Sequence, residues 1–159
     1  MSIDERLAEL GIELPDPPGA VGSYVPVARD GDLASVSGQV PLIDGAILHP
    51  GRVGADVPVE RAQEAARRCV LQTLSALRAE LGSLERIRRV LQVSVFVVSA
   101  PGFTGQSVVA NAASDLLAEV LGAAGTHSRA AIGVAELPLG APVEVTLVAR
   151  VDEDEGSPG

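Results

Sequence analysis

The hydrophobic positions of the chain recur with two different periods, and each change of period marks the end of a predicted element. Residues 58–81 and 107–121 carry apolar side chains at every third or fourth position, so each run predicts an amphipathic helix. Shorter runs rich in Val, Ile and other strand-forming residues predict strands, separated by Gly, Pro and Asp turns. The predicted strands cover residues 24–28, 33–37, 46–48, 87–98, 130–136 and 142–151.

The last predicted strand shows how the sheet is oriented. Its apolar positions, such as Val143 and Val145, alternate with Glu144 and Thr146. Two long helices packed on one face of a mixed β-sheet form an α+β sandwich. The other sheet face has no predicted cover, although strands such as 93–98 carry apolar residues on both faces. An uncovered apolar face predicts that the chain associates with copies of itself.

Both ends of the chain lie outside this pattern. Residues Ser2 to Glu5 have the form of a helix capping box, and prolines crowd positions 15–19. The last residues are acidic and lack apolar side chains, which is typical of disordered segments. We therefore expect an N-terminal helical extension and Pro-rich linker over 1–20, one α+β domain over 21–151 and a disordered acidic tail over 152–159.

Composition narrows the classes of partner. The 159 residues have a formal net charge of −9, and the aromatic side chains are limited to Tyr24, Phe96 and Phe103. Proteins that bind nucleic acids usually present a basic face or aromatic stacking platforms, so this class is disfavoured. No apolar run reaches the roughly 18 residues that span a bilayer. The charged N-terminus does not resemble a secretory signal, so we expect a cytoplasmic protein without nucleic-acid or membrane partners.

All twelve basic residues are arginine, and the chain has no lysine. A side-chain Schiff base and a conventional pyridoxal phosphate site are therefore excluded. Recognition of a carboxylate has to use the planar fork of a guanidinium. Cys69 is the only cysteine, which excludes an intrachain disulfide. Because Cys69 lies on an apolar helix stripe, we interpret it as a core residue, with a reactive thiol as the alternative.

Two charged residues beside apolar strands are candidates for binding or chemistry. Arg129 precedes a strand in which Ala131 and Gly133 are small, so it either has room for a ligand or is an exposed residue at a strand end. Glu144 lies between two valines. It is either a solvent-facing side chain or a carboxylate in a partly dry cleft, where its pKa suits the transfer of a water proton. His127 is interpreted as a surface residue.

A longer pattern joins these residues. The segment Ser37-Gly38-Gln39-Val40-Pro41 is followed, in order and at matching spacing, by Arg129, Leu137-Pro138 and Val143-Glu144. With Tyr24 and Asn111, this pattern resembles the RidA/YjgF family, also called the L-PSP family, from about Val21 to Val151. The resemblance implies a chorismate-mutase-like α+β fold and a homotrimer. It also implies that sheets line the centre of the trimer and that ligand clefts lie between subunits.

The resemblance further implies a chemistry. Family members of the deaminase type hydrolyse reactive enamines and imines, such as 2-aminoacrylate, to keto acids and ammonia without a metal or cofactor. By position, Arg129 would clamp the substrate carboxylate and Glu144 would activate the attacking water. The cleft would be lined by Tyr24, Ser37, Asn111 and Ala131, the last of which stands where the deaminases often have cysteine.

Some positions depart from the family pattern and indicate a divergent subgroup. The Pro-Ala that commonly precedes the arginine is replaced by His127-Ser128, and the helix after Asn111 carries Ser114 where aromatic residues are usual. Two other functions stay open on this fold. One is a non-catalytic binder or regulator that holds a small carboxylate-bearing metabolite through Arg129, and the other is a different small-metabolite enzyme. The older family label of endoribonuclease is disfavoured by the acidic charge.

Overall fold

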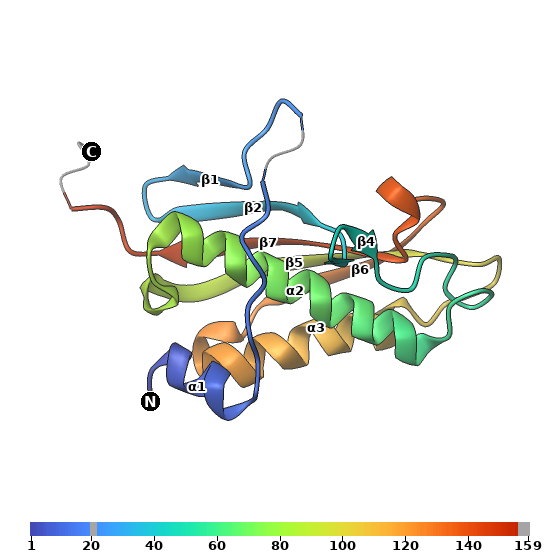
Figure 1. Ribbon diagram of the computed structural model, residues 1–159, viewed down its shortest axis with the longest axis horizontal. Coiled ribbons are helices and arrows are strands. Elements are labelled where there is room, and N and C mark those ends of the chain that lie inside the picture. The colour runs from blue at the N-terminus through green and yellow to red at the C-terminus, as the bar shows by residue number, and fades with distance from the viewer. Residues whose placement is uncertain (20–21, 156–159) are drawn as a thin grey trace.

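The chain forms two layers, with a five-stranded sheet on one side and its helices on the other (Figure 1). The computed structural model describes residues 1–19 and 22–155. The helices are α1 (Ile3–Glu9), α2 (Val59–Leu81) and α3 (Gln106–Leu121), with the 3-10 turns η1 (Leu84–Arg86), η2 (Gly122–Gly125) and η3 (Pro138–Gly140). The strands are β1 (Val27–Asp30), β2 (Leu33–Gln39), β3 (Leu42–Ile43), β4 (Ala46–Ile47), β5 (Ile87–Val98), β6 (Ser128–Val134) and β7 (Val143–Val151).

The main sheet has the strand order β1-β2-β7-β5-β6. β5 and β6 run parallel, whereas the other neighbouring strands run antiparallel. Because a parallel pair needs a crossover connection, α3 bridges β5 and β6 and lies against both. Val95 of β5 is opposite Val145 of β7 on one side and Ala131 of β6 on the other. This topology places Arg129 and Glu144 on two strands that are separated by β5.

The core fills the space between the sheet and the two long helices. Val143, Val145 and Leu147 of β7 are buried, whereas Glu144 and Thr146 between them are only half-buried. The alternation confirms the inner and outer faces that the sequence predicted for this strand. Because α2 contacts β7, the inner face is the one that the helices cover.

α3 is more apolar than the sequence analysis recognised. With the turn that follows it, the segment Gln106–Gly125 has the length and composition of a helix able to cross a membrane, with a mean hydropathy of 1.3. This differs from the expectation that no run is long enough. The side chains of Val109, Leu116 and Leu117 are buried in the core. We interpret α3 as a core helix whose apolar composition follows from its burial between α2 and the sheet.

Two strands begin at different residues than predicted. β1 covers Val27–Asp30 instead of 24–28, because Pro26 has no N–H for a strand ladder. β6 begins at Ser128, which pairs with Gln92 of β5, and so includes Arg129. The arginine is therefore the second residue of the strand and not the residue before it.

The N-terminal extension packs onto the helical layer. α1 has the predicted capping box between Ser2 and Glu5, and Leu7 joins the core. The linker then crosses α2 (Figure 1), where the Ser75 hydroxyl donates to the Pro15 carbonyl oxygen at 2.6 Å. The predicted boundary at residues 20 and 21 lies outside the described residues.

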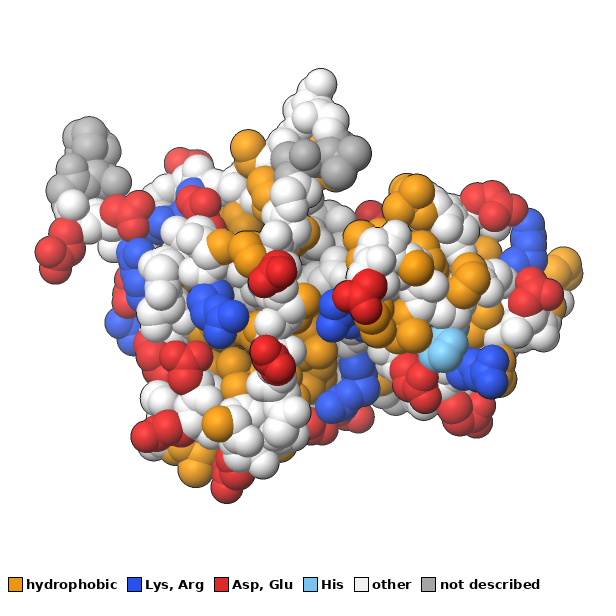
Figure 2. Space-filling view, in the orientation of Figure 1, with side chains coloured by type: hydrophobic (Ala, Val, Ile, Leu, Met, Phe, Trp, Pro, Cys, Tyr) orange, Lys and Arg blue, Asp and Glu red, His pale blue; other side chains and the backbone are white. Residues whose placement is uncertain are grey.

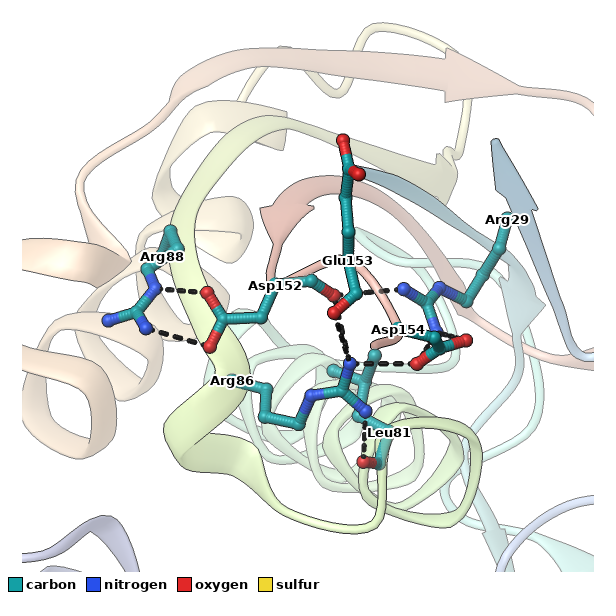
Figure 3. A network of polar contacts seen from close by, with 7 residues as sticks. All are labelled: Arg29, Leu81, Arg86, Arg88, Asp152, Glu153 and Asp154. Carbon is teal, nitrogen blue, oxygen red and sulfur yellow. Dashed lines mark hydrogen bonds and ion pairs between the residues drawn. The ribbon is translucent and has the colours of Figure 1, made fainter. Parts of the chain in front are cut away.

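The start of the C-terminal tail differs from the predicted disorder. Arg88 contacts both carboxylate oxygens of Asp152, and Asp154 pairs with Arg29 at 2.9 Å and with Arg86 at 2.8 Å (Figure 3). These five residues, which we call the tail cluster, fasten the tail to β1, η1 and β5. The cause is electrostatic, since each carboxylate lies against a guanidinium. Residues 156–159 lie outside the described part of the chain.

In the described part of the chain, no helix covers the second face of the main sheet, because the helices lie together on the other side (Figure 1). Phe96, Ile132 and Val148 lie on this open face and are half-buried or exposed. On the face drawn in Figure 2, arginine and acidic side chains are interspersed and form no basic patch. The open apolar face agrees with association between copies, which stays a prediction.

Candidate functional site

Arg129 extends from β6 toward α3. Its Nη1 atom donates to Asn111 Oδ1 at 2.8 Å and to Ser114 Oγ at 3.1 Å, and its Nη2 atom lies 3.5 Å from the Ser107 carbonyl oxygen. Asn111 and Ser114 are three residues apart on α3, so they share one helix face. The structure therefore brings together Arg129 and Asn111, two of the residues singled out in the sequence.

The acceptors around Arg129 are all uncharged. Among residues 1–19 and 22–155, the guanidinium has no ion pair, and no acceptor contacts its Nε atom. Nε and the neighbouring Nη2 form the edge of an arginine that binds a carboxylate through two parallel hydrogen bonds. The chain thus holds Arg129 mainly by Nη1, with a longer contact at Nη2, and Nε has no acceptor among the described residues.

The space beside Arg129 is smaller than the two small residues of β6 suggested. Ala131 follows on the same face and packs, half-buried, against the core. A Cβ at Gly133 would meet Gln106 Nε2 at 2.9 Å, because Gln106 of α3 fills that position and donates to Ser99 Oγ at 3.1 Å. A ligand at this part of β6 is therefore limited to the region beside Arg129 and Ala131, because Gln106 occupies the position next to Gly133.

Glu144 extends from β7 over Gly38 of β2. A β-bulge interrupts the β2 ladder between Val36 and Gln39, and a Cβ at Gly38 would overlap the Glu144 Oε1 atom. Partial burial raises the pKa of the Glu144 carboxyl above its ordinary value. A carboxyl group shifted in this direction exchanges a proton at a pH closer to neutrality, as a general acid–base needs.

Ser37 and Tyr24 belong to the same region as Glu144. The Ser37 hydroxyl donates to the Val25 carbonyl oxygen at 2.6 Å, and its N–H donates to the Pro26 carbonyl oxygen at 2.9 Å. Ser37 therefore fastens the segment that carries Tyr24 to the bulge beside Glu144. The Tyr24 side chain is exposed, with 53% of its surface accessible, so its ring is open to a ligand or to another copy.

The candidate residues form two groups on opposite faces of the sheet. The group on the helix side, which we call the arginine half, consists of Arg129, Asn111, Ser114, His127 and Ala131. The group on the open side, which we call the glutamate half, consists of Glu144, Gly38 and Ser37, and Ser37 ties the segment that carries Tyr24 to it through Val25. Because β5 separates β6 from β7 and the two side chains leave opposite faces, one copy of the chain does not bring Arg129 and Glu144 into a single cleft.

Two residues of the arginine half were missed in the sequence. His127, interpreted as a surface residue, is partly buried; its Nε2 atom lies 2.9 Å from Ser114 Oγ and its Nδ1 atom 2.5 Å from the Gly125 carbonyl oxygen. A signal was present, because His127 is two residues before Arg129 and Ser114 is three after Asn111, so each pair shares a face. The missing information was that β6 packs on α3.

Cys69 is not positioned as a nucleophile. It is fully buried on α2, with its thiol 3.6 Å from the Val143 carbonyl oxygen. Burial, and to a smaller extent the Glu144 charge, raises the pKa of this thiol well above its ordinary value. This favours the core interpretation over the reactive thiol. In the described part of the chain, no group of three or more His, Cys, Asp or Glu is placed to hold a metal ion.

Known proteins share this fold and sequence pattern. The chain is 45% identical over 148 residues to protein TCP17 of Trypanosoma cruzi, which covers 92% of each chain. The crystal structure of Atu1372, a protein of unknown function from Agrobacterium tumefaciens, has 45% identity and a TM-score of 0.88, covering 94% of this chain and 92% of that one. A crystal structure described as a putative endoribonuclease from Shewanella oneidensis has 31% identity and a TM-score of 0.91, covering 95% and 100%.

A more distant likeness supports the fold alone. The YjgF gene product of E. coli has 22% identity and a TM-score of 0.60, covering 85% of this chain and 93% of that one. Residues 4–151 match the family described as YjgF/chorismate mutase-like, putative endoribonuclease. This match spans almost the whole chain and includes both halves of the candidate site. The chain therefore belongs to the YjgF/chorismate mutase-like family.

Proposed function

We propose that this protein hydrolyses small enamine or imine intermediates that carry a carboxylate, of the 2-aminoacrylate type, to keto acids and ammonia. The observation that carries the proposal is the state of Arg129. Its guanidinium is held by uncharged acceptors and keeps both its charge and its Nε–Nη2 edge for an external carboxylate. A fixed cation with an open edge is a preorganised site for such a substrate.

The complete site needs a second copy of the chain. Arg129 and Glu144 leave opposite faces of one sheet, so a cleft that contains both takes its arginine half from one subunit and its glutamate half from the next. The open apolar face with Phe96, Ile132 and Val148 provides a surface for that contact. A closed ring of copies, in this family a homotrimer, would then repeat the same composite site at every interface.

The proposed chemistry requires little of the protein beyond positioning. The imine carbon is electrophilic, and Arg129 would hold the substrate through its carboxylate. Glu144 would take a proton from water as the water oxygen bonds to that carbon. With the imine nitrogen protonated, this attack gives a neutral carbinolamine. The same carboxyl would return its proton to the amine nitrogen and then accept the hydroxyl proton as the C–N bond breaks, so that the keto acid forms and ammonia leaves. Partial burial raises the pKa of Glu144, and this direction favours a group that both accepts and returns a proton.

The direct test is keto-acid release from freshly generated 2-aminoacrylate. We expect the wild type to accelerate release, and Arg129→Ala to raise KM about 100-fold through loss of a charge-assisted bidentate contact. Glu144→Gln should preserve pyruvate binding and lower kcat. Gly38→Ala should act in the same way, because the new Cβ displaces the Glu144 carboxylate.

Matched controls exist for each variant. Arg78→Ala and Glu80→Gln remove the same functional groups from exposed positions at the end of α2. Gly19→Ala adds a methyl group where nothing lies within 4 Å of the new Cβ. These three variants should behave as the wild type. Pyruvate binding without acceleration by the wild type would replace the proposal with the non-catalytic binder, and absence of both would reject it.

The composite site has its own test. Arg129→Ala and Glu144→Gln should each impair turnover, but in a mixed ring an interface is intact when the Glu144→Gln subunit supplies its arginine half and the Arg129→Ala subunit supplies its glutamate half. Random mixing at equal amounts should restore about a quarter of the wild-type rate, since each half is intact with a chance of one in two. No recovery after proven subunit exchange would show that both residues act within one subunit.

The endoribonuclease label of the relatives can be tested on the same samples. The net charge of −9 and the interspersed surface charges disfavour an RNA-binding face. We expect no RNA degradation by the wild type. Degradation that Glu144→Ala abolishes would show that the site acts on RNA.

A further inference from the structure

The arginine half contains a hydrogen-bonded chain that ends in a histidine. It runs from Arg129 Nη1 to Ser114 Oγ at 3.1 Å, from Ser114 Oγ to His127 Nε2 at 2.9 Å, and from His127 Nδ1 to the Gly125 carbonyl oxygen at 2.5 Å. Ser114 lies in the middle of α3, and His127 immediately precedes β6. The chain therefore joins the helix, the turn η2 and the strand that carries Arg129.

The hydrogens of this chain can be assigned from its ends. The Gly125 carbonyl oxygen only accepts, so His127 Nδ1 carries the hydrogen. In a neutral imidazole Nε2 is then an acceptor, and it takes the single hydrogen of the Ser114 hydroxyl. The lone pairs of Ser114 Oγ remain for the guanidinium, which only donates. Each donor in the chain is thus matched with one acceptor.

This assignment gives His127 a specific role. A serine in the middle of a helix usually turns its hydroxyl hydrogen to the carbonyl oxygen one turn before it. Here His127 Nε2 accepts the hydroxyl hydrogen of Ser114, so the lone pairs of Ser114 Oγ are free to accept from Arg129. With Asn111 Oδ1 accepting the other Nη1 hydrogen, both hydrogens of Nη1 are engaged. Turning the guanidinium about the Nε–Cζ bond would break both of these contacts, so they hold its plane in one orientation.

We propose that His127 and Ser114 are positioning residues that hold Arg129 in the orientation that receives a carboxylate. This inference rests on the proposed function, because it specifies how the arginine half is held for its ligand. His127 acts through Ser114 and does not touch the ligand. This role differs from a contribution to the stability of the fold, because His127 and Ser114 affect ligand binding only through the orientation of the Arg129 side chain.

Two substitutions of His127 separate the contacts of its two nitrogens. His127→Gln places an acceptor near the Nε2 position and should retain the Ser114 contact. His127→Asn retains a donor near Nδ1 for Gly125 and loses the Ser114 contact. We expect His127→Asn and Ser114→Ala to weaken pyruvate binding and raise KM by about 5- to 20-fold with kcat changed less than about twofold, as for loss of a hydrogen bond to a charged group. His127→Gln should recover most of this loss.

A double substitution distinguishes positioning from a structural role. In the Arg129→Ala background, His127→Asn should cause no further loss of pyruvate affinity, because the residue on which it acts is absent. An equal loss with and without Arg129 would overturn the proposal. His49→Gln serves as the matched control, because His49 contacts Glu64 and lies outside the hydrogen-bonded series from Arg129 to Gly125.

The orientation of Arg129 is measured directly by NMR of 15N-arginine side chains. In the wild type, the engaged Nη1 should give signals separate from Nη2 because rotation is slowed. The signals should merge in His127→Asn and stay separate in His127→Gln. Separate signals that merge as expected, without any pyruvate binding, would reject the proposed function and leave the positioning role standing. Pyruvate affinity and signals unchanged in His127→Asn would reject the positioning role alone.

Discussion

The tail cluster and the arginine half both hold arginine side chains through several contacts, but the charge of the contacting groups differs between the two regions. In the tail cluster, Arg29, Arg86 and Arg88 meet the carboxylates of Asp152 and Asp154, so the chain neutralises its own cations (Figure 3). In the arginine half, Arg129 meets an amide, a hydroxyl and a backbone carbonyl, so it is fixed in place without being neutralised.

The difference separates a structural use of arginine from a binding use. An arginine that already has a carboxylate has little to gain from a second one, whereas an arginine held by uncharged groups still has its full charge to offer. We therefore interpret the tail cluster as a set of ion pairs that holds the start of the C-terminal tail in place. Arg129 has the properties of a ligand site, because the orientation of its guanidinium is fixed before the ligand arrives. Substitutions that exchange these two conditions test the distinction.

The largest effect should come from giving Arg129 a carboxylate of its own. Asn111→Asp replaces the amide oxygen 2.8 Å from Nη1 with a charged one of nearly the same shape. We expect pyruvate affinity to fall about tenfold, because the internal carboxylate competes with the ligand for the guanidinium. Calorimetric titration measures this, with Asp115→Asn on the same helix as a control for charge. Unchanged or tighter binding would contradict the distinction.

The reverse change removes the carboxylates of the tail cluster. Asp152→Asn combined with Asp154→Asn leaves three arginines without charged partners, one of which, Arg29, also has a buried Nε without a hydrogen-bond partner in the described structure. We expect Tm to fall by about 3 °C at low salt, with pyruvate affinity unchanged. The loss should shrink in high salt, where surface ion pairs are screened. A change in pyruvate affinity would show that the cluster is coupled to the site.

Acid pH should erase the contribution of the tail cluster. Pairing with Arg88 lowers the pKa of Asp152, and pairing with Arg86 and Arg29 lowers the pKa of Asp154. A lowered folded-state pKa means that the stability is present above the ordinary aspartate pKa of about 3.9 and is lost as pH falls through the folded value. The Tm difference between the wild type and the double variant should therefore be constant in neutral buffer and should shrink as pH falls below about 4. A difference that does not shrink in acid would mean that charge is not its cause.

The smallest effect concerns Glu144, a carboxylate that has no ion pair within residues 1–19 and 22–155. Partial burial raises its pKa, so the folded state favours the neutral form. The sign is opposite to that of the tail: stability is greatest below the ordinary glutamate pKa of about 4.3 and falls as pH rises through the raised value. Glu144→Gln should therefore raise Tm by about 1 °C in neutral buffer and leave it unchanged in acid. A lower Tm in neutral buffer would indicate that the carboxylate has a stabilising partner.

The sequence predicted the layers of the fold well because the relevant signals are local. The period of three to four residues located α2 and α3 within one residue at each end, and the alternation of β7 identified its buried face. Errors occurred where a nonlocal partner decides the outcome. Ser128 belongs to β6 because Gln92 pairs with it, and Asp152 is held because Arg88 from another strand reaches it.

The candidate site was only partly accessible to the same reasoning. The sequence pattern singled out Arg129, Glu144 and Asn111, and the structure places Asn111 in contact with the arginine. Ser114 and His127 were passed over, although their spacing places them on the same faces as Asn111 and Arg129, because only the packing of β6 on α3 brings the two faces together. Nothing in the sequence showed that Arg129 and Glu144 face opposite sides, since this depends on the strand order.

By itself, then, the sequence determined the types of element, the inner face of the sheet and the restriction of carboxylate binding to arginine, all of which follow from side-chain chemistry and short-range periodicity. Only the tertiary structure decided that the arginines of the tail cluster are neutralised and that Arg129 is not. That outcome depends on groups brought together from distant parts of the chain: Asp154 beside Arg29, and Asn111 beside Arg129. Electrostatic interactions fall off with distance in space and not along the sequence, so they are settled only when the strands and helices have packed.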